Sequence, residues 1–219
     1  MKKKVQIQNL VYNYRMTHDT GFAPNPFWGV LTLATCKPQI RKYLKLDEAR
    51  EVWLAGWYTE ALKKTYRKEN KKNFHTEEGH EYLIYLARVT KKISIGDYWS
   101  EFPEKRAIAT HNLRCLKRYG DNIYEKIDDQ VYKQHLNISH RTAKDKKTDL
   151  SGENVLICNE FYYFGHQKPL RICAKKCPKI INRGYVKAVN VTEFLDYVKQ
   201  HKPLYSRTRG PLLRVRKRD

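Results

Sequence analysis

Residues 19–41 read DTGFAPNPFWGVLTLATCKPQIR, and they combine aromatic, glycine, proline, cysteine and cationic residues more densely than a core strand or helix requires. Gly21 permits a positive φ, and Pro24 and Pro26 each fix φ and keep the preceding residue extended. The first part of the stretch therefore predicts a rigid loop that carries aromatic rings. The run 29–35 is apolar and β-branched, which predicts a buried strand after the loop.

Cys36, Lys37 and Arg41 directly follow this strand, and Phe22 and Trp28 lie on the loop before it. A stiff aromatic loop beside a cationic strand end suits a flat, anionic ligand such as a nucleotide. The alternative is a folded aromatic corner with two surface cations.

The net charge is the strongest bulk signal. Lys and Arg number 44 against 23 Asp and Glu, which gives +21 and a pI near 9.7. Such an excess attracts polyanions, and the commonest is nucleic acid, of which we favour DNA. A membrane surface is the alternative, but no long basic helix with an aliphatic face stands out.

The length of 219 residues fits one domain with a sizeable core. No stretch approaches 18 apolar residues, and the start MKKKVQIQNL has no apolar signal core, so no membrane span or secretory peptide is expected. Five irregularly spaced cysteines argue against a disulfide framework. We therefore expect a cytoplasmic protein.

Apolar runs predict strands at 5–14, 51–57, 81–90, 154–158 and 161–165. Gly56 within its run indicates a bulge or the close approach of something flat. Alternation along 161–164 would send one pair of rings to a core and the other to a pocket or solvent. Helices are predicted at 59–72, from Ser94, and at 191–200, where Thr192 is the expected cap.

Residues 133–152 have the composition of a long flexible loop. Together these elements predict an α+β domain over residues 1–201, with a mixed, barrel-like β-sheet flanked by three to four helices. Residues 202–219 are predicted to form a basic C-terminal arm. Contacts with a nucleic-acid backbone are expected from the basic helix and this arm, through Lys64, Lys68, Arg207, Arg209, Arg214 and Arg216.

Few residues have the spacing of a known metal-binding, cofactor-binding or catalytic motif. Cys173 and Cys177 with His166 lack a second ligand pair for zinc, and no phosphate-binding or dinucleotide-binding glycine motif occurs, so no metal or cofactor is expected. Cys36 is a candidate nucleophile because Lys37 and Arg41 follow it, although most lone cysteines at strand ends are only packed.

The run from Thr20 to Gly29, continued by 31–38 and by Ile40 and Arg41, resembles the signature of the nucleotide modification associated domain family, type two. Further matches follow in order across most of the chain, at Leu83–Tyr85, Arg88–Val89, Tyr98–Trp99, Gly120–Tyr124, Val155–Leu156, Phe161–Gly165 and Arg183–Gly184. The resemblance implies a role in DNA base hypermodification in bacteria or phages.

Two positions depart from the family pattern. Ala49, Arg50 and Glu51 stand where the family has a Gly-Asp pair, and a Gly-Arg-Gly-His-like segment is reduced to Asn182–Tyr185. Roles for that aspartate and that histidine are therefore not expected here.

A likeness of architecture to barrel-like modules with an aromatic cage suggests how a base would be held. We expect a base to stack on rings while amides and carboxylates read its edge and cations hold its phosphate. The expected nucleotide-binding residues are Gly21, Phe22, Asn25, Trp28, Lys37, Arg41, Trp57, Asp121, Asn122, Tyr163 and Arg183.

Three functional hypotheses follow. The favoured one is a module that binds a nucleotide or modified base without chemistry of its own, alongside partner enzymes of a modification system. The second is an enzyme that makes or transfers a base modification, with Cys36, Asp19 or Asp121 in the reaction. The third is a general RNA-binding domain.

Overall fold

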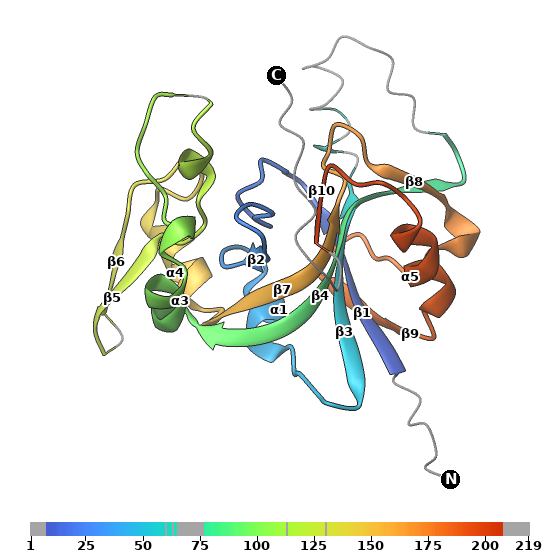
Figure 1. The fold of residues 1–219 in the computed structure, drawn as a ribbon, viewed down its shortest axis with the longest axis horizontal. Coiled ribbons are helices and arrows are strands. Elements are labelled where there is room, and N and C mark those ends of the chain that lie inside the picture. Colours follow the sequence, from blue (N-terminus) through green and yellow to red (C-terminus); the bar gives the residue numbers. More distant parts are fainter. Residues whose placement is uncertain are drawn as a thin grey trace. The chain divides into compact units, whose positions relative to one another are not determined.

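The structure, a computed structural model, describes residues 8–59, 61–62, 64, 77–112, 114–129 and 131–207 (Figure 1). The chain divides into two compact units. Unit 1 contains residues 1–19, 46–89 and 160–219, and unit 2 contains residues 20–45 and 90–159. Two strands, β4 (His80–Ser94) and β7 (Asn154–Tyr163), contribute residues to both units.

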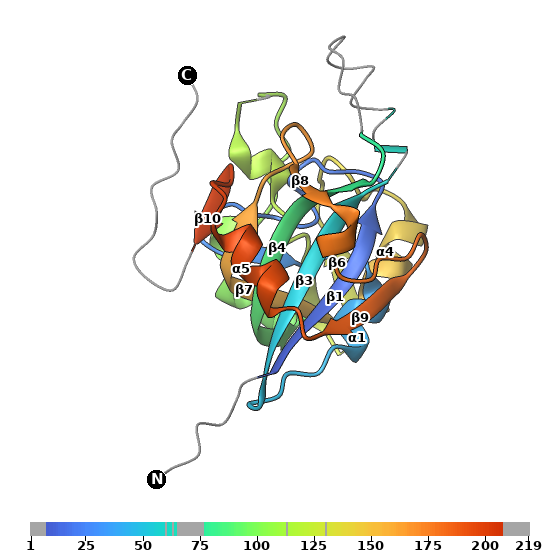
Figure 2. The same cartoon turned by 90° about the vertical axis from the view of Figure 1, so that its right-hand side faces the viewer.

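Unit 1 is built on a mixed β-sheet. Its strand order is β10 (Tyr205–Arg207), β7, β4, β3 (Arg50–Tyr58), β1 (Gln8–Met16) and β9 (Tyr185–Val189), and β8 (Leu170–Cys173) pairs with β4. The β1–β3 pair is parallel, whereas β1–β9, β3–β4, β4–β8 and β7–β10 are antiparallel. Figure 2 shows β4, β3 and β1 side by side.

This strand order corrects one prediction and confirms another. Among the described strands, β10 and β9 stand at opposite ends of the order, so the sheet is open and the expected barrel-like closure is wrong. The expected mixed α+β class with a large sheet and flanking helices is confirmed.

The interior of the sheet explains its apolar runs. Trp53, Leu54 and Ala55 on β3 are fully buried, as expected for a strand covered on both faces. At Gly56 an added Cβ would lie 2.4 Å from the sulfur of Met16 and 2.3 Å from the ring of Tyr85. The register of β3 shifts at this point, so the predicted bulge is confirmed, and the flat group that approaches is a tyrosine.

Helix α5 (Thr192–Lys199) buries Phe194, Leu195 and Val198 in the core of unit 1, where Phe194 stacks on Trp57 at 5.7 Å. Its N-cap is Val191 rather than Thr192. All four rings along 161–164 are buried, so none faces solvent, and the alternate pair Tyr162 and Phe164 belongs to the core cluster of unit 1. A short 3-10 turn, Ala174–Lys176, follows β8.

Unit 2 contains β2 (Leu31–Leu33), which pairs antiparallel with Leu156–Cys158 of β7, and the hairpin β5 (Tyr124–Asp128) and β6 (Val131–Gln134). Its helices are α1 (Pro38–Tyr43), α3 (Ile95–Glu101) and α4 (Ala143–Leu150), with 3-10 turns at Pro103–Lys105 and Leu116–Tyr119. Phe22, Ile95, Tyr98, Ile123 and Tyr124 belong to one core cluster.

Ser94 caps α3 by accepting a hydrogen bond from the Asp97 amide, which confirms the helix start predicted at Ser94. The flexible loop expected at 133–152 is wrong, because α4 lies within it. Thr142 and Asp145 cap the start of α4 reciprocally, each side chain accepting from the other's backbone N–H. No helix in the described ranges is long and apolar enough to cross a membrane.

Candidate active site

Cys36 lies at a sharp turn of unit 2 between β2 and α1. Its φ is +57° and that of Lys37 is +41°, so two consecutive non-glycine residues adopt the left-handed conformation. This conformation is uncommon for residues with a Cβ, and it concentrates at functional positions. A tight strand-to-helix turn of this kind projects the side chain at its apex away from the backbone, as in the nucleophile elbow of hydrolases.

His140 and Asp149 complete a line of three side chains with Cys36. The Sγ atom of Cys36 lies 3.4 Å from Nε2 of His140. On the other side of the ring, Nδ1 of His140 forms a short hydrogen bond with Oδ2 of Asp149. Asp149 is fully buried, whereas the His140 side chain is 16% exposed. The arrangement of thiol, imidazole and buried carboxylate is that of a nucleophile, its base and the group that orients the base.

Asp149 also holds the backbone of Cys36. Its Oδ1 accepts the Cys36 N–H at 2.8 Å, and its Oδ2 accepts the Tyr124 hydroxyl at 2.8 Å. The residue lies in the last turn of α4, and His140 lies two residues before the Thr142 cap of that helix. One carboxylate therefore fixes both the elbow and the ring that faces it.

Arg41 is fully buried beneath the elbow. Its guanidinium donates to the carbonyl oxygens of Cys36 at 2.8 Å, Asn154 at 2.8 Å and Asp149 at 2.6 Å. Its Nη2 lies 4.0 Å from Oδ1 of Asp149, which provides a buried countercharge. Gly152 makes room for it, because a Cβ there would lie 2.5 Å from Cζ of Arg41. Arg41 thus acts as a structural clamp and offers no solvent-facing guanidinium.

The protonation of His140 favours a charged pair. Burial by itself would lower its pKa, but the hydrogen bonds to Asp149 and Cys36 outweigh burial and raise the pKa to about 10. The imidazole is therefore protonated at neutral pH, and its Nε2 lies 3.4 Å from the sulfur of Cys36. Burial lowers the pKa of neighbouring Lys37, which the charge of Cys36 partly offsets.

A second buried polar cluster lies elsewhere in unit 2. Asp121 accepts hydrogen bonds from Thr32 at 2.7 Å and Tyr98 at 2.6 Å. Burial raises the pKa of Asp121 and lowers that of Lys105 to about 8, although each charge partly offsets the effect on the other. Lys105 donates to Asn25 Oδ1 at 2.8 Å. These groups are fully buried and satisfy one another, which indicates a structural network.

The expected nucleotide-binding residues are thus distributed over both units. In unit 2, the Asn122 amide is buried and bonds backbone carbonyls of Tyr98 and Phe102. Phe22 is buried with its ring 5.2 Å from that of His140. Gly21 has a φ of +77°. Trp28 is half-buried, with the Lys105 and Lys117 ammonium groups 5.7 and 5.3 Å from its ring.

In unit 1, Trp57 is fully buried and donates to Asn13 at 3.0 Å. Tyr163 donates to Asp19 at 2.5 Å, and Asp19 is itself buried. Arg183 is exposed. Lys64 is exposed and helical, Arg207 lies in β10, and Lys68, Arg209, Arg214 and Arg216 lie outside the described residues.

Sequence reasoning missed His140 and Asp149 because it treated 133–152 as a loop. The signal that was present is Thr142 followed three residues later by Asp145, which marks a helix start and places Asp149 on that helix. The pairing with Cys36 has no such local signal. Among the described residues, no group of three or more His, Cys, Asp or Glu side chains is arranged to hold a metal ion.

The family model described as nucleotide modification associated domain 2 matches residues 8–208. Neither the search of curated proteins nor the search of solved structures gave a match.

Proposed function

The chain belongs to the nucleotide modification associated domain 2 family, and from this premise we propose that it is an enzyme of a nucleotide modification system that uses Cys36 as its nucleophile. The observation that carries the proposal is the line of Cys36, His140 and Asp149 at a left-handed elbow. A module that only binds nucleotides has no need for a thiol paired with a charged imidazole. The geometry therefore favours the enzyme among our three hypotheses.

The reaction best matched to this geometry is acyl transfer. The Cys36 thiolate attacks a carbonyl carbon, and its Sγ–C bond forms as the bond to the leaving group breaks. His140 donates the proton on Nε2 to that leaving group. In the second step, water or an amine gives a proton to His140 and attacks the thioester, which releases the acyl group and restores the thiolate.

Asp149 and Arg41 support this cycle without contacting the substrate. Asp149 fixes the ring so that Nε2 faces Sγ, and it stabilises the imidazolium that exists before attack. Arg41 holds the Cys36 carbonyl and so maintains the elbow. Both are positioning residues.

The partner is proposed to be a nucleotide or a base within DNA. The family association and the net charge of +21 support this choice. Trp28 and Lys37 are the half-buried members of the expected binding set in unit 2. The contacts proposed for a nucleic-acid backbone use the basic residues of 59–72 and of the arm at 202–219.

The reactivity of Cys36 tests the proposal. An ordinary thiol is only about 1% thiolate at pH 6.5, because its pKa is about 8.5. Iodoacetamide at pH 6.5 should therefore modify Cys36 much faster than Cys115, a half-exposed cysteine of the same unit, as measured by peptide mass spectrometry. His140→Asn should slow the reaction of Cys36 up to about 100-fold and leave that of Cys115 unchanged. Equal rates for the two cysteines in the wild-type protein would refute the proposal.

A cellular measurement tests the link to nucleotides. Nucleosides from DNA of cells that carry the native modification system would be compared by mass spectrometry, with wild-type protein and with Cys36→Ala. We expect a modified nucleoside to disappear with Cys36→Ala and to remain with Cys115→Ala. A nucleoside profile that is identical for wild type and Cys36→Ala would contradict an enzymatic role in base modification.

A further inference from the structure

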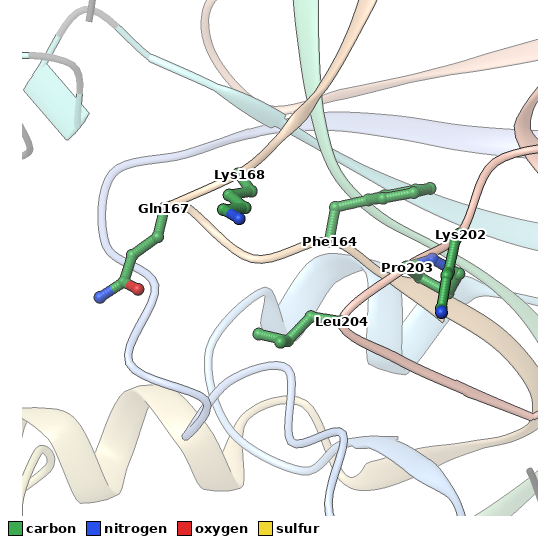
Figure 3. Close-up of a pocket in the computed structure, with 6 residues that line it drawn as sticks. All are labelled: Phe164, Gln167, Lys168, Lys202, Pro203 and Leu204. Atoms are coloured by element: carbon green, nitrogen blue, oxygen red, sulfur yellow. The ribbon is translucent and has the colours of Figure 1, made fainter. Parts of the chain in front are cut away.

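The lysine side chains of this protein lie in two contrasting environments. Lys168 and Lys202 are exposed, and Figure 3 shows them on separate sides of a cavity of about 270 Å³ in unit 1. Lys105 of unit 2 is instead fully buried. Lysine is almost never fully buried unless it is paired, so the groups around Lys105 decide what its amine can do.

Lys105 lies against the side-chain amide of Asn25, which is also fully buried. Its Nζ is 2.8 Å from Oδ1 of Asn25, and it also donates to the backbone carbonyls of Asn25 at 3.2 Å and Val30 at 2.9 Å. Because a C=O bond is about 1.2 Å long, the amide carbon Cγ of Asn25 lies within about 4 Å of Nζ. An amine and the carbonyl carbon of an amide are therefore close to contact inside unit 2.

The Asn25 amide is held in one orientation. Its backbone N–H and carbonyl form a pair of hydrogen bonds with Thr32, both at 2.9 Å. Its Nδ2 donates to the Tyr119 carbonyl at 2.7 Å, and its Oδ1 accepts the Phe27 N–H at 3.2 Å. A donor on Oδ1 stabilises negative charge there, which makes the adjacent carbon more electrophilic.

Asp121 supplies a buried carboxyl group to the same cluster. It accepts the hydroxyl of Thr32, the backbone partner of Asn25, at 2.7 Å. Lys105 lies on the adjacent segment, because its carbonyl accepts the Asn122 N–H at 3.1 Å. Burial raises the pKa of Asp121 and lowers that of Lys105 to about 8, so it favours the neutral form of both groups. A neutral amine is a nucleophile, and a protonated carboxyl is a proton donor.

We propose that Lys105 and Asn25 form an isopeptide bond, an amide between their side chains, in the folded protein. Nζ of Lys105 attacks Cγ of Asn25 and forms a C–N bond, while the bond from Cγ to Nδ2 breaks. Asp121 gives a proton to the departing nitrogen and takes one from the attacking nitrogen, so one ammonia leaves and the carboxyl group is restored. No oxidant, reductant or further reactant is needed. Fixing the two groups together accelerates a reaction that is slow between free molecules.

The bond would join segments that are 80 positions apart in the chain. Asn25 lies in the aromatic loop that precedes β2, and Lys105 ends the 3-10 turn Pro103–Lys105. The bond would therefore tie the loop that carries Trp28 to the rest of unit 2. The proposal rests on this buried cluster and not on the chemistry of Cys36.

Mass spectrometry of the denatured full chain tests the proposal. The linked protein should be lighter than its calculated mass by one ammonia, about 17 Da. After digestion with trypsin, we expect a branched peptide that joins residues 16–41 to residues 93–106 through Asn25 and Lys105. The full calculated mass would overturn the proposal. A loss of ammonia without the branched peptide, as from cyclisation of an asparagine, would overturn it as well.

Three variants locate the bond. Lys105→Met and Asn25→Ala should each show the full mass calculated for their sequences, because each lacks one partner. Lys92→Met is the matched control, since Lys92 is a half-buried lysine of unit 2 that donates to the carbonyls of Lys42 and Leu44. It should keep both the loss of ammonia and the branched peptide. A loss of ammonia that persists in Lys105→Met would overturn the assignment.

Asp121→Asn tests the proton transfer, because an amide keeps the size of the carboxyl group but cannot carry the proton. Tryptophan fluorescence shows whether this variant is folded, and in folded protein the linked fraction should fall at least about tenfold. Folded Asp121→Asn protein that is linked as completely as the wild type would overturn the role of Asp121.

Cys36→Ser separates this proposal from the proposed function. It should be linked as the wild type is, and loss of the bond in this variant would contradict a reaction independent of Cys36. Equal alkylation of Cys36 and Cys115 in a protein that is fully linked would refute the proposed function alone.

Discussion

Replacing Arg41 with methionine should lower the free energy of unfolding by several kcal/mol, on the order of the cost of breaking a buried ion pair. Methionine keeps much of the side-chain volume but leaves the carbonyls of Cys36, Asn154 and Asp149 without their donor. It also removes one of the two cations beside the buried Asp149 carboxylate, the other being His140. An unpaired buried polar group costs about 1–3 kcal/mol, and breaking a buried ion pair costs about 3–5 kcal/mol. Because these costs are shared by one network and do not add, we expect a loss of about 3–5 kcal/mol.

Urea unfolding followed by tryptophan fluorescence measures this loss, since unit 2 contains Trp28 and Trp99. Arg41→Lys should fall between wild type and Arg41→Met, because an ammonium keeps the charge but cannot reach three carbonyls with one planar group. Lys42→Ala is the matched control: the neighbouring cation forms an exposed pair with Glu153, and its loss should leave stability nearly unchanged.

A loss of unfolding free energy below about 1 kcal/mol for Arg41→Met would refute the reasoning, because removing a buried, hydrogen-bonded guanidinium should destabilise the fold by more than this. Reduced alkylation of Cys36 in Arg41→Lys protein that is still folded would support the assignment of Arg41 as a positioning residue. Unchanged alkylation would show that the elbow keeps its geometry without the clamp.

Gly152→Ala should destabilise the protein by about 1–3 kcal/mol in the same urea assay, because its Cβ would overlap the fixed guanidinium of Arg41. Gly96→Ala is the control and should be tolerated, because its Cβ would contact only a flexible lysine side chain. Unfolding measured over a range of pH tests the pairing of His140. Because its pKa in the folded protein is raised above the usual 6.5, the pairing stabilises the fold fully below pH 6.5. This stabilisation is lost as the pH rises through about 10. The Cys36→Ser variant should therefore have a higher free energy of unfolding than the double variant with Cys36→Ser and His140→Asn, and this difference should shrink from pH 7 to 10. A difference that stays constant over this range would contradict the pairing.

Local patterns predicted much of the fold. The apolar run around Trp53 is strand β3, and Gly56 marks the point where its register shifts. Ser94 caps α3 as expected. These features depend on a residue and its near neighbours, through burial, φ and hydrogen bonds to the adjacent backbone, so one stretch of sequence carries enough information.

The local sequence around Arg41 did not distinguish between two possible roles of this residue. A cation just after a strand is equally compatible with a bound phosphate and with a buried clamp for carbonyl oxygens. The choice depends on whether water or protein surrounds the guanidinium, and here Gly152 and the end of α4 enclose it. That environment is assembled from segments more than 100 positions along the chain, such as Asp149 at a separation of 108.

The sequence by itself determined that Cys36 follows a strand and precedes a helix, that the chain is strongly basic, and which runs enter the core. Only the tertiary structure decided that an imidazole and a buried carboxylate lie beside Cys36, because His140 and Asp149 lie 104 and 113 residues away along the chain. Any of the eight histidines is chemically able to serve as that base. A catalytic pairing requires atoms within about 3–3.5 Å, and long-range packing alone sets such a distance.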